Sequence, residues 1–220
     1  MNKLLTILLV LAFTLSSPFP GFERGKAPSF TAKAVKGTEF VDINYPEDFK
    51  DKYMVLIFYP FDFTYVCPTE LIAFSDKYAE FQNLNTEVLG ISADSQFTHL
   101  AWIQTPKKQG GVGELNYPLV SDFSKNIGRA YKVLEEDSND DLYGAALRGL
   151  FIIDGEQNIR HLQINDAPVG RNVEEVLRLI QAFQHTDEHG VVCPANWEKG
   201  SMTMDPTEAG KNEYFHSLYN

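Results

Sequence analysis

Apolar runs of strand length alternate with amphipathic segments along most of this chain, from about residue 27 onward. Short continuous apolar runs predict buried strands, here at Met54–Tyr59, Glu87–Ser92, Tyr117–Val120 and Gly149–Asp154. Apolar residues spaced three and four apart predict helices, here at Pro68–Asn85, Ser95–Thr105 and Asn172–Gln184. Such alternation is typical of an α/β domain with a largely central sheet.

The segment Asn158–Ile164 shows a different pattern, because polar and apolar residues alternate along it after a turn at Asp154-Gly155. Alternation predicts a half-buried strand, and we expect it at an edge of the sheet. An edge strand leaves backbone hydrogen-bonding groups unpaired. This segment could therefore pair with its copy in a second subunit.

Residues 1–20 contain one lysine, an apolar run from Leu4 to Leu15, and then small residues and prolines. This is the pattern of a secretory signal peptide, and the run is short for a membrane span of about 20 residues. We place cleavage between Ser16 and Pro20; a buried helix, a plain extension and a two-part organelle leader remain open. We therefore expect the secretory pathway (endoplasmic reticulum or secretion), with plastid, mitochondrion or cytoplasm as alternatives.

The other end of the chain, residues 187–220, carries glycine, proline and charge with weak periodicity. We expect an arm that packs only at its aromatic positions. The predicted organisation is thus a leader at 1–20, one α/β domain at 27–186 and the arm at 187–220.

Composition narrows the class of protein. The net charge is −11, which argues against nucleic acid and acidic membranes as partners, since both attract basic surfaces. With the short leader run, we expect no stable membrane insertion. Two cysteines in 220 residues are too few for a disulfide scaffold, and they could be one bridge, two spectators or a redox pair.

Cys67 lies between a predicted strand that ends at Pro60 and a predicted helix, so it falls in the first turn of that helix. Pro68 suits this position because first-turn amides lack intrahelical partners. The same unpaired N–H groups and the positive end of the helix dipole favour a reactive thiolate. Thr64 could donate a hydrogen bond to the sulfur or to an arriving oxygen. A buried structural cysteine is the alternative.

Four motifs together resemble the typical two-cysteine peroxiredoxins. The stretch FYPFDFTYVCPTE resembles their active-site segment, with Pro60, Thr64 and Cys67 at matching positions, and VCPANW resembles the segment around their second cysteine, here Cys193. LRGLFIID and VGRN resemble the segments that carry two active-site arginines, here Arg148 and Arg171. The resemblance spans residues 27–214 in the correct order, and it implies a thioredoxin-like fold with a central mixed sheet flanked by helices.

This resemblance implies a thiol peroxidase that reduces hydrogen peroxide and organic hydroperoxides without a bound cofactor or metal. The Cys67 thiolate would attack the peroxide and become a sulfenic acid. Arg148 would stabilise the thiolate and the charge on the oxygens, and Glu70, one turn after the cysteine, could orient Arg148 and Arg171. Ordinary surface ion pairs are the alternative for the two arginines.

In the family, the second cysteine attacks the sulfenic acid of another subunit, so the resemblance implies an intersubunit disulfide between Cys67 and Cys193. A permanent bridge within one chain is the alternative. The chain has no C-x-x-C motif, and the resemblance implies thioredoxin or a similar protein as reductant. It also implies a homodimer that assembles into a decamer of five dimers.

Two further motifs concern regulation. Gly110, Gly111 and Gly113 resemble a glycine-rich loop of the family, with Val112 where leucine is usual, and Tyr214-Phe215 resembles a tail motif that packs over the first helix. In the family these two motifs slow disulfide formation and expose the sulfenic acid to further oxidation. A plain flexible loop is the alternative for the glycines. The acidic segment before Arg148 looks longer than the family pattern.

Two groups of histidine-containing residues give weaker signals. His185, His189 and Cys193 are spaced four apart, but a structural zinc site takes four ligands and no fourth is near. His99 and Trp102 are interpreted as packing or surface residues of a helix. The competing functions are a holdase chaperone and a secreted structural or signalling protein with one intrachain disulfide.

Overall fold

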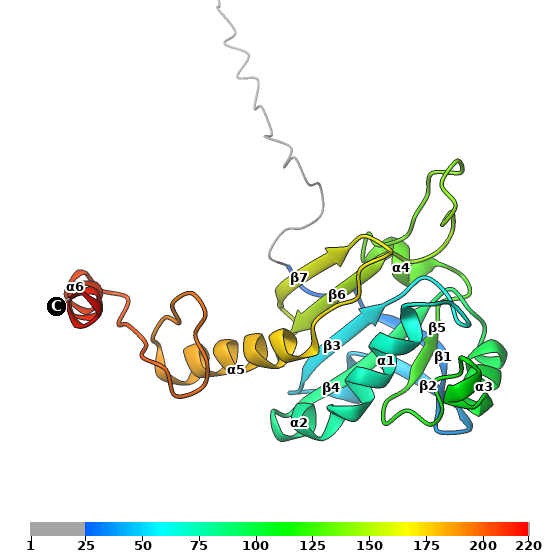
Figure 1. Cartoon of the computed structure of the whole chain (residues 1–220), viewed down its shortest axis with the longest axis horizontal. Coiled ribbons are helices and arrows are strands. Elements are labelled where there is room, and N and C mark those ends of the chain that lie inside the picture. The colour runs from blue at the N-terminus through cyan, green and yellow to red at the C-terminus, as the bar shows by residue number, and fades with distance from the viewer. Residues whose placement is uncertain (1–24, 220) are drawn as a thin grey trace, which may run out of the picture.

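The computed structural model describes residues 25–219, and within them the strands form one seven-stranded sheet in the order β2-β1-β5-β4-β3-β6-β7 (Figure 1). The strands are β1 Phe30–Lys36, β2 Glu39–Tyr45, β3 Tyr53–Phe58, β4 Thr86–Ser92, β5 Leu119–Ser121, β6 Arg148–Ile153 and β7 Ile159–Asn165. The helices are α1 Cys67–Asp76, α2 Tyr78–Asn83, α3 Gln96–Gln104, α4 Asn126–Ala130, α5 Val173–His189 and α6 Glu208–Leu218, with 3₁₀ turns η1 Glu47–Phe49 and η2 Lys107–Gln109.

Strands β3, β4 and β5 run parallel, whereas β1 pairs antiparallel with β5 and β2, and β6 pairs antiparallel with β3 and β7. The prediction of a central mixed sheet flanked by helices is therefore confirmed. β7 lies at one edge of this sheet, as the alternating pattern of Asn158–Ile164 predicted.

The core lies on both faces of the sheet, and β3 shows why its sequence is apolar throughout. Val55 and Ile57 contribute to a cluster with Leu71 and Phe74 of α1. The alternate side chains of β3 belong to a second cluster on the opposite face, which includes Tyr131. Successive strand residues point to opposite faces, so a strand covered on both sides needs no polar positions.

The predicted helix over Pro68–Asn85 is divided into α1 and α2 at Lys77, whose ammonium contacts Glu80 and Glu174 at 2.8 Å each. The helix predicted at Ser95–Thr105 is present as α3, with Ser95 as its N-cap. The β1–β2 hairpin and α6 were not predicted.

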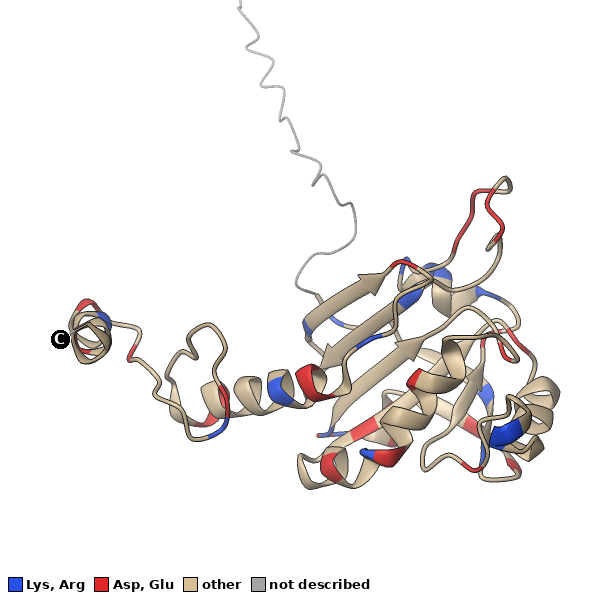
Figure 2. Ribbon diagram, in the orientation of Figure 1, with Lys and Arg blue, Asp and Glu red and all other residues tan. Residues whose placement is uncertain are grey.

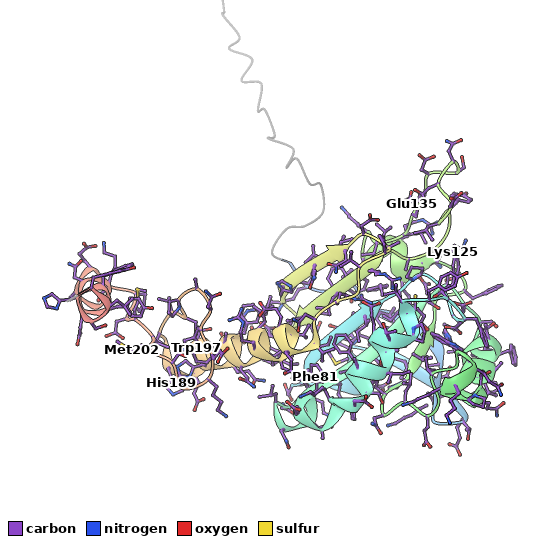
Figure 3. All side chains as sticks on the ribbon, in the orientation of Figure 1. Phe81, Lys125, Glu135, His189, Trp197 and Met202 are labelled. Carbon is purple, nitrogen blue, oxygen red and sulfur yellow. The ribbon has the colours of Figure 1, made fainter. Side chains whose placement is uncertain are left out.

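α5 begins after its N-cap Asn172 and ends at His189, before Gly190, which has the left-handed backbone (φ 67°) that glycine adopts without strain. It includes the first residues of the predicted arm. The chain then extends away from the sheet, and α6 lies at the far end (Figure 1). Trp197 packs against the last turns of α5, with its ring 5.0 Å from that of His185 (Figure 3). In contrast, no residue of α6 is buried.

The acidic segment before β6 projects from the domain as a loop (Figures 1 and 2). Its base is closed by backbone bonds between Glu135 and Ala145 and between Gly144 and Glu135. Among residues 25–219, none of the helices combines the length and apolar composition that crossing a membrane requires.

Candidate active site

Cys67 is the first residue of α1 and is completely buried. The chain reaches it from the end of β3 through the segment 59–66, and Pro68 occupies the first turn of the helix. The thiol thus lies at the helix N-terminus, where N–H groups without intrahelical partners and the helix dipole favour a negative charge. The position predicted from the sequence is confirmed.

Arg148, the first residue of β6, brings a positive charge to this thiol. Its Nη1 lies 3.3 Å from the Cys67 Sγ and 2.7 Å from a carboxylate oxygen of Glu70. Its Nε donates to the carbonyl of Ala167 at 2.6 Å. The guanidinium is buried, so its charge acts on the sulfur with little screening by water.

Glu70 lies in the first turn of α1 and joins two arginines. Arg171 donates to it from Nε at 2.7 Å, from Nη2 at 2.9 Å and from its backbone N–H at 2.8 Å. The Nη1 of Arg171 donates to the carbonyls of Phe58 and Gly149. The expected orienting role of Glu70 is thus matched by its geometry, and the alternative of surface ion pairs does not fit side chains this deeply buried.

The charges of this buried cluster balance only when the cysteine is ionised. Arg148 and Arg171 contribute two positive charges and Glu70 contributes one negative charge. A thiol would leave one positive charge uncompensated in a buried site, which is costly, whereas a thiolate neutralises it. The arrangement therefore favours the nucleophilic form of Cys67.

Pro60 is buried and Thr64 is half-buried in the segment that leads to the cysteine. The Thr64 hydroxyl donates to the carbonyl of Phe61 at 2.8 Å. The prediction that it donates to the sulfur is therefore wrong for this state. Its oxygen keeps lone pairs that can accept a hydrogen bond from an arriving peroxide.

Cys193 lies on the arm, where its Sγ is 3.9 Å from the carbonyl of Ala182. It lines a cavity of about 450 Å³ together with Arg178, Phe183 and neighbouring arm residues. Partial burial raises the pKa of the Cys193 thiol, and the nearby Arg178 charge opposes the rise. Within residues 25–219 there is no group of three potential metal ligands, and the His185 ring stacks on that of His189 instead.

The glycine-rich loop is a defined turn held on α3. Trp102 donates from Nε1 to the carbonyl of Gly110 at 2.8 Å, and Val112 is completely buried. A side chain at Gly111 would place its Cβ 1.8 Å from the Thr105 carbonyl oxygen, so only glycine fits. Gly113 has a positive φ of 65°.

Tyr214 and Phe215 are on α6, where their rings contact each other at 5.6 Å, and Phe215 is 47% exposed. α6 lies on the opposite side of the molecule from the glycine-rich loop (Figure 1). The structure therefore does not bring the two regulatory motifs together within one chain.

Sequence reasoning missed one buried pair near the site, formed by Asp62 and His99. The carboxylate and the imidazole are 2.7 Å apart, and neither side chain is exposed. The sequence held one signal, a histidine on the apolar side of a predicted helix, but a surface or packing role explained it equally well.

These features define a class of protein: an enzyme whose nucleophile is a buried cysteine at a helix start, held beside an arginine on a mixed sheet. Comparison with known proteins identifies the family. Residues 24–162 match the AhpC/TSA family, and residues 182–217 match the C-terminal domain of 1-Cys peroxiredoxin. The chain belongs to the AhpC/TSA family and is a peroxiredoxin, a thioredoxin-like thiol peroxidase that reduces peroxides with a cysteine.

The chain is similar to known peroxiredoxins over most of its length. It is 57% identical to Peroxiredoxin-2 of Bos taurus, over 86% of this chain and 92% of the relative. It is 55% identical to the mitochondrial thioredoxin-dependent peroxide reductase of Homo sapiens, over 87% of this chain and 73% of the relative. The reduced 2-Cys peroxiredoxin of Plasmodium vivax superposes with a TM-score of 0.84 at 42% identity, covering 90% of this chain and 100% of that one.

Proposed function

We propose that this peroxiredoxin uses Cys67 to attack the peroxide and Cys193 to resolve the product, with a thioredoxin-like protein as reductant. The observation that carries the assignment is the 3.3 Å contact between the Arg148 guanidinium and the Cys67 sulfur inside a buried cluster that a thiolate neutralises. The reductant is inferred from the relative named thioredoxin-dependent peroxide reductase.

The cycle has three steps. In the first, the Cys67 thiolate attacks one peroxide oxygen, an S–O bond forms, the O–O bond breaks, and the leaving oxygen departs as water or alcohol after protonation. Arg148 stabilises charge on the oxygens as that bond breaks. In the second, the Cys193 thiolate attacks the sulfenic sulfur, and a disulfide forms with loss of water. In the third, a dithiol protein reduces the disulfide by thiol exchange.

The position of Cys193 supports a disulfide between subunits. Arg171, just before α5, contacts Glu70 at the active site, whereas Cys193 contacts Ala182, nine residues after Val173 along α5. A helix rises 1.5 Å per residue, so about 14 Å along α5 separates its start beside the active site from the position next to Cys193. A disulfide needs Cα atoms within about 7 Å. Both cysteines are free thiols in this structure, and an arm that leaves its own domain can instead reach a partner.

Two variants test the assignment. Cys67→Ser should abolish peroxide consumption and covalent dimers. Cys193→Ser should reduce one peroxide per chain and then stop under thioredoxin-driven cycling. Wild type should run as a dimer on non-reducing gels after one equivalent of peroxide. Equal residual cycling in the two variants, or an oxidised wild type that runs as a monomer, would contradict the roles.

We propose further that the dimer forms through β7 and that dimers assemble into a ring of five. β7 is an edge strand whose Ile164 is 39% exposed. Three aromatic side chains on another part of the surface are at least half exposed, namely Phe63, Phe97 and Phe123. Large exposed aromatic rings are enriched where proteins associate. Sedimentation of the reduced protein should give a decamer; a monomer at micromolar concentration contradicts this proposal.

The tail motif is proposed to act across subunits, since α6 does not reach the glycine-rich loop of its own chain. Tyr214 and Phe215 of one subunit would cover α1 of the partner and keep its first turn from unwinding. Truncation before Tyr214 should then speed disulfide formation and lower the sulfinic fraction of Cys67 at high peroxide, measured by mass spectrometry. If the truncated chain over-oxidises as readily as the full chain, the tail has no such role.

The leader, residues 1–20, lies outside the described residues. Relatives from Homo sapiens and Mus musculus are named mitochondrial, so we favour an organelle leader over the secretory pathway. Residues 1–26 fused to a fluorescent protein should enter an organelle. Glycosylation or secretion of a reporter that carries an acceptor site would instead support the signal-peptide interpretation.

A further inference from the structure

The segment that contains Pro60 and Thr64 is held in place by a buried network of hydrogen bonds. Asp62, in the middle of this segment, has a completely buried side chain. Its carboxylate receives a hydrogen bond from the Tyr59 hydroxyl at 2.8 Å on one oxygen and faces the His99 Nδ1 at 2.7 Å on the other. Both oxygens are therefore held.

The other side of the imidazole is also held. The His99 Nε2 lies 3.3 Å from the carbonyl of Val120, the middle residue of β5. Both ring nitrogens thus face an oxygen atom, one on Asp62 and one on Val120. The Nδ1 contact with the Asp62 carboxyl group, at 2.7 Å, is the shorter of the two and therefore the stronger.

The network joins the segment to parts of the fold that have their own support. His99 is on α3, whose N-cap Ser95 accepts from Thr98. The backbone N–H of Asp62 donates to Asp94 at 2.9 Å, and Asp94 follows β4. The segment is thereby fixed to α3, to β5 and to the residues that follow β4, none of which contains the reactive cysteine.

We propose that His99 is a positioning residue which, through Asp62, holds the segment 60–66 in the arrangement that attacks peroxide and delays its release for disulfide formation. The proposal rests on the proposed roles of Cys67 and Cys193. The peroxide step and disulfide formation place opposite demands on the mobility of this segment. Peroxide attack needs Pro60, Thr64 and the sulfur in fixed places, whereas the disulfide forms only after the sulfur leaves its buried position.

Two neutral variants of similar size separate this role from general stability. The amide nitrogen of His99→Asn occupies the place of Nδ1 and can still donate to Asp62. That of His99→Gln occupies the place of Nε2 and points to Val120 instead. Their difference isolates the contact with the carboxylate. Gln104→Asn, at an exposed position of the same helix, is the control.

Stopped-flow kinetics of the full chain should show that His99→Gln slows the peroxide step about tenfold, because small misplacements at a reacting centre are costly. Disulfide formation should speed up about tenfold, as expected for the loss of one buried hydrogen bond, and the sulfinic fraction should fall. His99→Asn should lie close to wild type in both steps, and Gln104→Asn should match wild type.

General destabilisation would not speed one step while slowing the other. The proposal is overturned if His99→Gln leaves both rates unchanged, changes them in the same direction, or behaves like His99→Asn. If His99→Gln does not fold, Tyr59→Phe removes the other hydrogen bond to Asp62. This variant should also slow the peroxide step and speed disulfide formation, with smaller changes than His99→Gln. If Tyr59→Phe does not shift the two rates in opposite directions, the proposal is overturned. A wild type that does not react at Cys67 would instead refute the proposed function.

Discussion

Glu70 is the residue whose loss should disturb the site most, and Glu70→Gln is the sharpest way to remove its charge. The amide keeps the size of the side chain but cannot neutralise Arg148 and Arg171. The side chains of all three residues are at most 4% exposed. Their charges would therefore remain buried with neither water nor a carboxylate to compensate them.

The size of the effect follows from this burial. Removing one partner of a buried ion pair costs about 3–5 kcal/mol because the remaining charge is uncompensated. Glu70 accepts four hydrogen bonds, two of them in a bidentate pair with Arg171, so we expect the upper half of this range. Typical domains are stable by about 5–15 kcal/mol, so the variant should fold but unfold in much less urea. Arg148 would also lose its anchor, and the peroxide step should slow at least about tenfold.

Urea unfolding of the reduced protein, followed by tryptophan fluorescence at one fixed protein concentration, measures the first effect, and stopped-flow kinetics measures the second. Glu80→Gln is the matched control, because its pair with Lys77 is 37–51% exposed and such pairs contribute about 0–1 kcal/mol. A Glu70→Gln stability within about 1 kcal/mol of this control would refute the reasoning on buried charge.

Three further predictions follow. Arg148→Ala should slow the reaction of Cys67 with peroxide at least about tenfold, in stopped-flow assays, by removing the charge beside the sulfur; an unchanged rate rejects that role. Because burial raises the pKa of Cys193, disulfide formation should accelerate about tenfold per pH unit through neutral pH and beyond pH 8; a plateau below pH 8 contradicts this. The hydrogen bond from Arg160 lowers the pKa of Asp187, so their pair stabilises the fold above about pH 3.9 and this contribution is lost as the pH falls below it. In Asp187→Asn, the urea midpoint of unfolding should therefore fall less than in wild type as the pH is lowered. An identical pH dependence of the midpoint in wild type and variant argues against a stabilising role of this pair.

The strands of the central sheet were predictable from local pattern. β3 and the central residues of β4 and β6 are apolar because both faces of the sheet are covered, and β7 alternates because it is an edge strand. The β1–β2 hairpin was missed, since its exposed residues dilute the apolar signal. α6 was missed because none of its residues is buried and it therefore lacks an apolar stripe.

Of the active site, the sequence indicated the residues but only partly their contacts. Cys67 at a helix start follows from the neighbouring strand and from Pro68, all within a few positions. Of the two acceptors expected for the Thr64 hydroxyl, the sulfur is not contacted, because a short polar side chain in a turn readily bonds to nearby backbone; the other, an arriving peroxide oxygen, stays a prediction. The pair of Asp62 and His99 gave no distinctive pattern, since its members are 37 positions apart.

The sequence by itself determined the α/β class, the family resemblance and the position of the nucleophile at a helix start, because these depend on local periodicity and on residue types within short segments. Only the tertiary structure decided which charges meet. Arg148 reaches the sulfur across 81 positions and Arg171 reaches Glu70 across 101, because β6 lies beside β3 in the sheet and the segment before α5 returns over α1. Strand order and burial are properties of the whole packed chain, and they convert these polar side chains into a balanced cluster around a thiolate.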